Sequence, residues 1–223
     1  MIHLYLSRLL LNPSDARVRR DLGNIYELHR TVMSGFPETM PAGERPLFRL
    51  EEDRDERPLL LVQSRTEPRW DGLPAGYLMP ASPFDPLANP AVKPIAPAFR
   101  PEQWLRFRLR ANPTKKESRE GRRQGRRVAI VREEAQLAWL GRKAEAGGFR
   151  FRLNDVRVND AGREFGWTRK GPDLDRGHAL ELHIVQFEGI LQVTDPDRFA
   201  ATLNAGIGSA KGFGCGLLSL APA

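Results

Sequence analysis

The segment from Gly206 to Gly216 constrains this chain more than any other stretch, because five of its eleven residues are glycine. Glycine loses more backbone entropy on folding than any other residue and adds no side chain to a core, so such a density needs a geometric or functional reason. Backbone amides in a segment of this kind can approach an anion closely. We therefore expect a loop that holds a phosphate-like group.

The spacing of these glycines excludes two common nucleotide-binding motifs. A Walker A loop ends in Gly-Lys followed by Ser or Thr, whereas Lys211 precedes its glycine. A dinucleotide fingerprint needs a glycine at the third place after Gly208, where this chain carries Lys211. The loop is therefore neither of these two nucleotide-binding motifs.

The charge of the chain favours a polyanionic partner. Lys and Arg number 35 against 28 Asp and Glu, which gives a net charge of +7. Only six of the basic residues are lysines, and the planar guanidinium of arginine suits bidentate contact with phosphate. A genome that favours arginine codons is an alternative cause of this ratio.

Cysteine usage and hydropathy indicate a cytoplasmic protein. The single cysteine, Cys215, cannot form a disulfide within the chain, and no Cys cluster is available for zinc. No apolar run approaches the roughly 18 residues of a membrane span. The first residues lack the basic region and small-residue cleavage site of a signal peptide. We expect no membrane partner.

Periodicity predicts a strand and a capped helix near the start of the chain. Residues 2–7 alternate between apolar and polar side chains, which predicts a strand with Ile2, Leu4 and Leu6 on its buried face. Asn24 is the predicted N-cap of a helix from Ile25 to Met33, with Glu27 in a capping-box position. Two strands near residues 47–51 and 59–63 follow, and residues 79–101 form a proline-rich, irregular linker.

The second half opens with a strand from Gln103 to Ala111. Three apolar side chains point one way along it and three arginines the other. The remaining predicted elements are a helix over 133–146, strands over 149–158, 180–187 and 191–194, a helix begun by Asp195-Pro196 and ended by Gly206, and a last strand over 217–220. The strand-helix-strand-strand order of the first half thus recurs.

This repeated order predicts an α+β fold of two tandem ferredoxin-like βαββαβ domains. We place the first domain at residues 1–98 and the second at 99–223, joined by the proline-rich linker. Exposed sheets and inter-domain clefts of this architecture are common platforms for RNA.

Four segments resemble one known family, and they occur along the chain in the order expected for that family. Residues 206–216 fit the Gly-apolar-Gly, five residues, Gly-apolar-Gly signature of the repeat-associated RNA-binding proteins of CRISPR systems, and residues 217–222 continue it as in the CasE branch. Residues 24–30 are similar to that family's catalytic helix, 108–115 to its arginine-asparagine-proline motif and 135–142 to its second-domain helix.

The resemblance implies an endoribonuclease of the type I-E Cascade complex, which cuts CRISPR transcripts at each repeat hairpin and keeps the product. Its partners would be repeat RNA and other Cascade subunits, with no cofactor, no metal and no small-molecule substrate. His29 and Tyr26 match the catalytic positions. RNA can be cleaved by its own 2′-hydroxyl, and a histidine suits the proton transfer. Whether His29 is acid or base, and whether Tyr26 orients the 2′-hydroxyl or the phosphate, stays open.

RNA binding is predicted for the glycine-rich segment and the basic clusters. Lys211 matches a family position. The predicted RNA contacts are Lys211, Gly206, Gly208, Gly212, Gly214, Gly216, Arg106, Arg108, Arg110, Lys115, Lys116, Arg126, Arg127, Arg157, Arg169 and Lys170. Two alternatives are a non-catalytic RNA-binding subunit of a Cascade-like complex and a ferredoxin-like RNA regulator unrelated to CRISPR.

Overall fold

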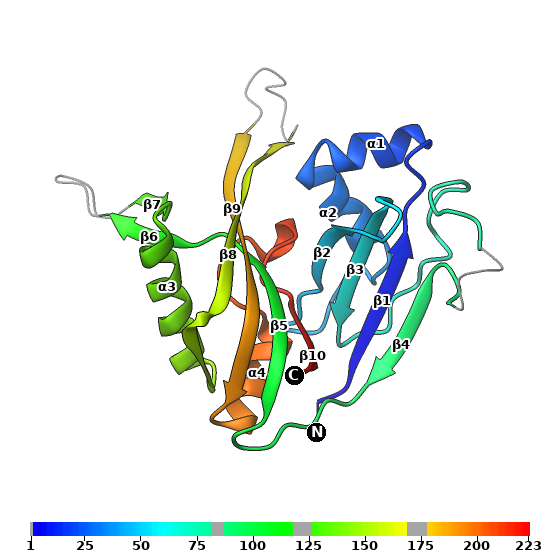
Figure 1. Cartoon of the computed structure of the whole chain (residues 1–223). Helices are drawn as coiled ribbons and strands as arrows, with labels where there is room; N and C mark the ends of the chain where they lie inside the picture. Colours follow the sequence, from blue (N-terminus) through cyan, green and yellow to red (C-terminus); the bar gives the residue numbers. More distant parts are fainter. Residues whose placement is uncertain (1, 82–86, 118–125, 169–177) are drawn as a thin grey trace.

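Two antiparallel four-stranded sheets carry most of the chain in the computed structural model, which describes residues 2–81, 87–117, 126–168 and 178–223 (Figure 1). The first part comprises β1 Leu4–Leu10, α1 Ala16–Leu22, α2 Ile25–Ser34, β2 Leu47–Glu52, β3 Pro58–Ser64 and β4 Ala91–Ile95. The second comprises β5 Trp104–Ala111, β6 Thr114–Glu117, β7 Arg126–Ala129, α3 Glu133–Ala146, β8 Phe149–Thr168, β9 His178–Val193, α4 Pro196–Ala205, the 3-10 turn η1 Lys211–Phe213 and β10 Leu218–Pro222.

The strand orders are those of two ferredoxin-like units. The first sheet runs β2-β3-β1-β4 and the second β10-β5-β9-β8, so each places its first and third strands at the centre. The second unit has both crossover helices, α3 and α4, with the β6–β7 hairpin inserted before α3. The predicted α+β class is confirmed.

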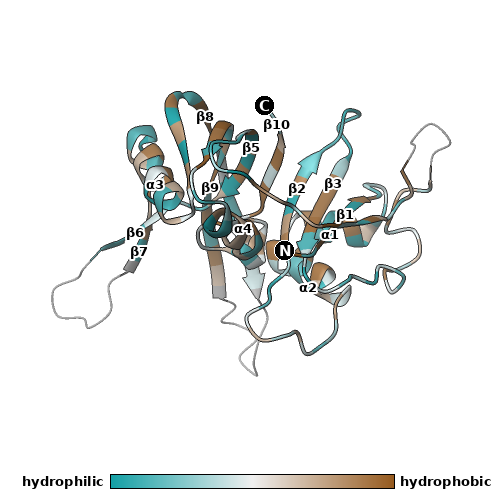
Figure 2. Cartoon of the chain, turned by 90° about the horizontal axis from the view of Figure 1, so that it is seen from below, coloured by the Kyte–Doolittle hydropathy of each residue, from teal (hydrophilic) through white to brown (hydrophobic). Residues whose placement is uncertain are grey.

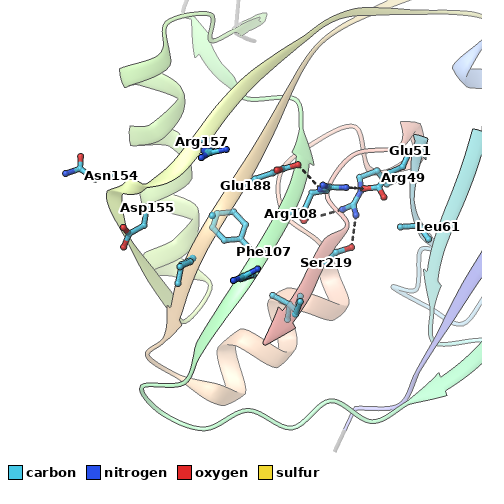
Figure 3. Close-up of a pocket in the computed structure, with 15 residues that line it drawn as sticks. Arg49, Glu51, Leu61, Phe107, Arg108, Asn154, Asp155, Arg157, Glu188 and Ser219 are labelled. Atoms are coloured by element: carbon cyan, nitrogen blue, oxygen red, sulfur yellow. Dashed lines mark hydrogen bonds and ion pairs between the residues drawn. The ribbon is translucent and has the colours of Figure 1, made fainter. Parts of the chain in front are cut away.

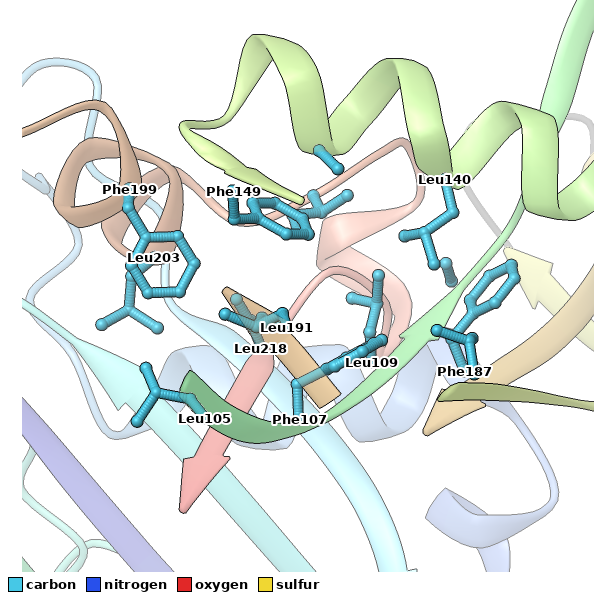
Figure 4. Packing of buried hydrophobic residues seen from close by; sticks show 14 of the residues in the cluster. Leu105, Phe107, Leu109, Leu140, Phe149, Phe187, Leu191, Phe199, Leu203 and Leu218 are labelled. Carbon is cyan, nitrogen blue, oxygen red and sulfur yellow. The ribbon is translucent and has the colours of Figure 1, made fainter. Parts of the chain in front are cut away.

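Helices cover one face of each sheet. In the second unit, Leu140 of α3 and Phe199 of α4 belong to one buried cluster with Leu109, Phe149 and Phe187 of the strands (Figure 4). The predicted apolar face of β5 is confirmed, since Leu105, Phe107 and Leu109 are buried. In the view of Figure 2, hydrophobic segments lie along these strands, while the β6–β7 hairpin stands away from the sheets.

The predicted buried face of β1 is correct at Leu4 but wrong at Leu6. Leu6 is 38% exposed, whereas Ser7 is 3% exposed and accepts a hydrogen bond from Trp70 Nε1 at 3.0 Å. The cause is the position of α1 and α2, which pack on the face that carries Ser7, Leu9 and Leu11. Leu4 points the other way and joins the core of the second unit.

Other elements also differ from the sequence prediction. The predicted linker contains β4, an edge strand paired with β1, where Pro94 is tolerated because only one side of the strand is hydrogen-bonded. The strands predicted over 180–187 and 191–194 are one strand, β9, since Gly189 continues the ladder opposite a bulge in β8. The short helix α1 was not predicted at all. It starts at the N-cap Asp15, but its arginine-rich sequence gives little apolar periodicity.

A small third cluster joins the two units. Ile25 of α2 packs with Leu182 and Ile184 of β9 and with Cys215 of the glycine-rich segment. These residues lie far apart in the sequence. The cluster therefore brings the start of α2 against the glycine-rich loop.

Candidate functional site

The start of α2 is fixed by its cap and by the β8–β9 hairpin. Asn24 Oδ1 accepts from the amides of Tyr26 and Trp167, both at 3.1 Å, and Asn24 Nδ2 donates to the Trp167 carbonyl at 3.2 Å. Gly166 lets the hairpin approach, because a Cβ atom there would lie 2.6 Å from Ile25 Cγ1 and 2.8 Å from Tyr26 Cδ2. The predicted cap of α2 is confirmed, and it also anchors the second unit.

Tyr26 and His29 lie one helical turn apart and meet the glycine-rich segment at the same place. The Phe213 ring lies edge-on to Tyr26 at a centroid distance of 4.9 Å and tilted against His29 at 5.9 Å. Gly212 lies over the imidazole, since a Cβ atom there would be 3.5 Å from His29 Cε1. The site is therefore built from both units, a juxtaposition that the sequence analysis did not foresee.

The environment of His29 favours the neutral imidazole. Burial of the half-buried ring lowers its pKa, and the nearby Arg45 guanidinium lowers it further. The ring also stacks on Phe48 at a centroid distance of 6.5 Å. Nδ1 is buried and has no hydrogen-bond partner within the part of the chain that the structure describes. A neutral imidazole at neutral pH can accept a proton.

The glycine-rich loop needs glycine for its backbone conformation. Gly206, Gly208, Gly214 and Gly216 all have φ between +73° and +89°, a region that other residues rarely adopt. Two of the amides are used inside the protein: Gly206 donates to Thr202 O and Gly216 to Arg110 O, both at 2.8 Å. Those two glycines shape the loop, and Gly214 is buried, which leaves the amides of Gly208 and Gly212 as candidates for an anion.

Lys211 stands next to this surface. Its Nζ donates to the Ala205 carbonyl at 2.6 Å. Burial lowers the pKa of Lys211, as do the positive charges of Arg45 and Lys143. Arg45 thus acts electrostatically on both His29 and Lys211. Arg45 was not among the predicted site residues, and no motif around it could have singled it out.

Of the three arginines of β5, Arg106 and Arg108 are exposed and Arg110 is partly buried. Arg108 pairs with Glu51 at 3.1 Å and with Glu188 at 2.7 Å, while Arg110 pairs with Glu164 and points toward the Gly214 carbonyl at 3.5 Å. Both guanidinium groups, predicted to bind RNA, therefore have carboxylate partners within the protein. Arg110 is only 11% exposed, and its guanidinium contacts the glycine-rich loop at Gly214.

Arg106 and Arg157 line a cleft of about 800 Å³ between the two sheets, together with Arg49, Glu51 and Glu188 (Figure 3). The cations of the β6–β7 hairpin lie elsewhere, beyond α3 and away from α2 in both views (Figure 1, Figure 2).

On that hairpin, Lys115 and Lys116 are exposed, with Lys115 3.1 Å from Glu117, and Arg127 donates to Thr114 Oγ1 at 3.3 Å. Three other groups predicted to bind RNA lie outside the described residues: Arg169, Lys170 and the side chain of Arg126.

The described residues contain no group of three or more His, Cys, Asp or Glu side chains placed to hold a metal ion. No helix among them is long and apolar enough to cross a membrane.

Comparison with known proteins decides the family. A family model described as CRISPR associated protein matches residues 4–222. The chain belongs to the CRISPR-associated protein family. The CRISPR-associated endoribonuclease Cse3 of Thermus thermophilus is 43% identical over 98% of this chain and 100% of its own length. The CRISPR system Cascade subunit CasE of Escherichia coli is 28% identical over the same shares.

A solved structure extends this likeness to three dimensions. Thermus thermophilus Cse3 bound to an RNA that represents a pre-cleavage complex superposes with a TM-score of 0.79 at 39% identity, covering 99% of this chain and all of that one. The resemblance stated from four motifs is confirmed at the level of the family and the fold.

Proposed function

We propose that this CRISPR-associated protein is an endoribonuclease that cleaves repeat hairpins in CRISPR transcripts and stays bound to the product as a Cascade subunit. The observation that carries the proposal is the meeting of Tyr26 and His29 with Gly212 and Phe213. This places a proton acceptor beside candidate anion-binding amides. The Cse3 and CasE relatives, named as an endoribonuclease and a Cascade subunit, support it.

The chemistry uses the 2′-hydroxyl of the RNA as nucleophile. His29, whose pKa is lowered by burial, accepts the 2′-hydroxyl proton while the 2′-oxygen bonds to phosphorus. The bond from phosphorus to the 5′-oxygen breaks, and the proton is delivered to that oxygen. The products are a 2′,3′-cyclic phosphate and a 5′-hydroxyl. General acid–base assistance of this kind contributes about 10²–10⁴-fold.

Lys211 and the loop amides stabilise the charge that develops on the phosphate oxygens. An ammonium has three N–H donors, so Lys211 can keep its bond to Ala205 and still donate to the phosphate. Tyr26 lies one turn from His29 and orients the 2′-hydroxyl. Preorganised donors are worth most where charge develops in the transition state.

The stem of the hairpin binds through shape and phosphate contacts. The exposed Lys115, Lys116 and Arg127 of the β6–β7 hairpin are suited to it, as are Arg106 and Arg157 at the cleft. Phe165 and Trp167 are 49% and 55% exposed. They alternate with Gly166, so they present their rings on the face of β8 away from α2, where bases can stack.

The two sheets support a division into domains at residues 1–98 and 99–223, because the chain crosses from one sheet to the other between β4 and β5. The processing of transcripts would take place in the cytoplasm, with other Cascade subunits as protein partners.

The decisive experiment incubates the purified protein with labelled repeat hairpin in EDTA. We expect one cut at the base of the stem, a 2′,3′-cyclic phosphate end, and loss of cleavage in His29→Ala. His3→Ala is the matched control, since His3 is exposed and lies close to the N-terminus, which Figure 1 shows away from α2. Tight binding without cleavage by the wild type would favour the non-catalytic subunit instead. Equal cleavage by His29→Ala would refute the assigned site.

A further inference from the structure

Two edge strands, β2 of the first sheet and β10 of the second, face each other where the units meet. Arg49 of β2 fills the space between them and is 1% exposed, the largest fully buried side chain described. Its guanidinium donates four hydrogen bonds, to Glu51 Oε1 at 2.7 Å, Arg108 O at 3.2 Å, Leu217 O at 3.1 Å and Ser219 Oγ at 2.7 Å. Figure 3 shows Arg49 with Glu51 and Ser219.

A buried guanidinium is a costly way to join two strands. Removing charges from water carries a large penalty, and well-packed apolar side chains often stabilise a fold as well or better. What arginine adds is a rigid planar fork with several donors in fixed directions. Because the acceptors lie in β2, in β5, in β10 and directly before β10, the guanidinium is fully hydrogen-bonded at only one register of β2 against the second sheet.

The register of β2 affects the candidate site through the residues next to Arg49 and next to its acceptor Leu217. Phe48 precedes Arg49, points to the opposite face of β2 and stacks on His29; its ring would also lie 3.5 Å from a Cβ atom at Gly214. On the other side, Leu217 directly follows Gly216, whose amide and carbonyl anchor the glycine-rich loop. Adjacent residues of β2 thus connect His29 to the strand that the loop enters.

We propose that Arg49 is a positioning residue for RNA cleavage: its four hydrogen bonds set the register of β2 against β10 and so hold Gly212 and Lys211 at His29. The inference rests on the proposed function. Arg49 itself is buried and does not touch RNA. A slip of β2 would separate the proton acceptor from the phosphate-binding loop without removing either.

The test compares Arg49→Met and Arg49→Lys with the control Arg57→Met. Arg57 also pairs with carboxylates, Asp53 and Asp55, but these belong to the turn between β2 and β3 within one unit. Three quantities are measured for each variant: the single-turnover cleavage rate across pH, the Kd for a repeat hairpin with a 2′-deoxy nucleotide at the cut, and the melting curve.

We expect Arg49→Met to lower the cleavage rate by about 100-fold, the effect of a misplacement of about 1 Å in an active site, with the Kd nearly unchanged. The pH midpoint should rise toward the ordinary value of histidine, because His29 loses packing. Arg49→Lys keeps the charge but cannot span all four acceptors, so it should also cleave slowly. Arg57→Met should match the wild type.

A folded Arg49→Met or Arg49→Lys with the rate and pH midpoint of the wild type would overturn the inference, as would equal losses of rate and affinity. If Arg49→Met does not melt cooperatively, Arg49→Lys and the milder Ser219→Ala decide by the same criteria. A wild type that binds but never cleaves would overturn the proposed function and this inference together. A cleaving wild type with unaffected variants would overturn the inference alone.

Discussion

Gly212 lies in van der Waals range of the His29 imidazole, with a Cβ atom at this position only 3.5 Å from His29 Cε1 and 3.6 Å from Nδ1. The two residues are separated by most of the chain, since His29 belongs to α2 of the first unit and Gly212 to η1 of the second. A methyl group at this position would lie in ordinary contact with the ring and would fill the space between the loop and the imidazole.

Gly212→Ala should therefore slow cleavage while leaving the fold intact. The distances are those of ordinary contact, so the methyl group fits, but it occupies the approach to His29. We expect a loss of up to about 100-fold in the single-turnover rate, as for other small displacements of reacting groups, and an unchanged melting temperature.

Gly141→Ala is the matched control, because Gly141 is in α3 and a Cβ atom there meets nothing within 4 Å among the described atoms. A Gly212→Ala protein that cleaves as fast as Gly141→Ala would show that the space over His29 is not used.

Gly206→Ala should instead destabilise the fold. Gly206 has φ +73° and ψ 163°, and a Cβ atom there would lie 2.8 Å from Leu47 Cδ1 and 2.9 Å from Gly216 O. Holding a non-glycine residue in this region costs about 1–3 kcal/mol, and the contact adds to the cost. Urea denaturation measures it. The control is Gly43→Ala, because Gly43 also has a positive φ, +77°, but a Cβ atom there would meet open space. Its smaller loss of stability separates the cost of backbone strain from the cost of the clash.

The pH dependence of cleavage follows from the pKa of His29. Burial and Arg45 lower that pKa below the ordinary value of 6.5, so the imidazole loses its proton at a lower pH than a free histidine. Because the base form is neutral, the single-turnover rate should rise with pH and reach its plateau at a midpoint below 6.5. Arg45→Gln removes the positive neighbour and should move the midpoint upward. A midpoint above 6.5 in the wild type, or a rate that falls across this range, would contradict the assignment of His29 as base.

Local signals predicted α2 and most of the second unit. Asn24 caps α2 through its own side chain, and the alternation of β5 depends only on neighbouring residues. The helix α1 and the strand β4 escaped prediction because their sequences are arginine-rich and proline-containing, and tertiary contacts rather than periodicity stabilise them. Local propensity is a weak guide in such segments.

The candidate residues were found by motif, but their arrangement was not. Nothing in the sequence places Gly212 on His29, since that contact depends on how the two sheets meet. The same holds for Arg108 and Arg110. Their binding to RNA was predicted because one face of the strand carries positive charge. Their partners Glu51, Glu188 and Glu164 come from other elements, so strand alternation alone could not show that these charges are paired.

This pairing predicts a difference between the basic residues in RNA binding. Lys116 is exposed on the β6–β7 hairpin, whereas Arg108 has two carboxylate partners. A cation that contacts a phosphate releases a counterion, so its removal weakens binding and lowers the slope of log K against log salt by about 1. We expect this for Lys116→Gln, measured by titration of the 2′-deoxy hairpin at several salt concentrations. For Arg108→Gln the slope should stay unchanged, because the guanidinium is already neutralised by Glu51 and Glu188. Equal changes of slope in the two variants would mean that Arg108 exchanges its carboxylates for phosphate when RNA binds.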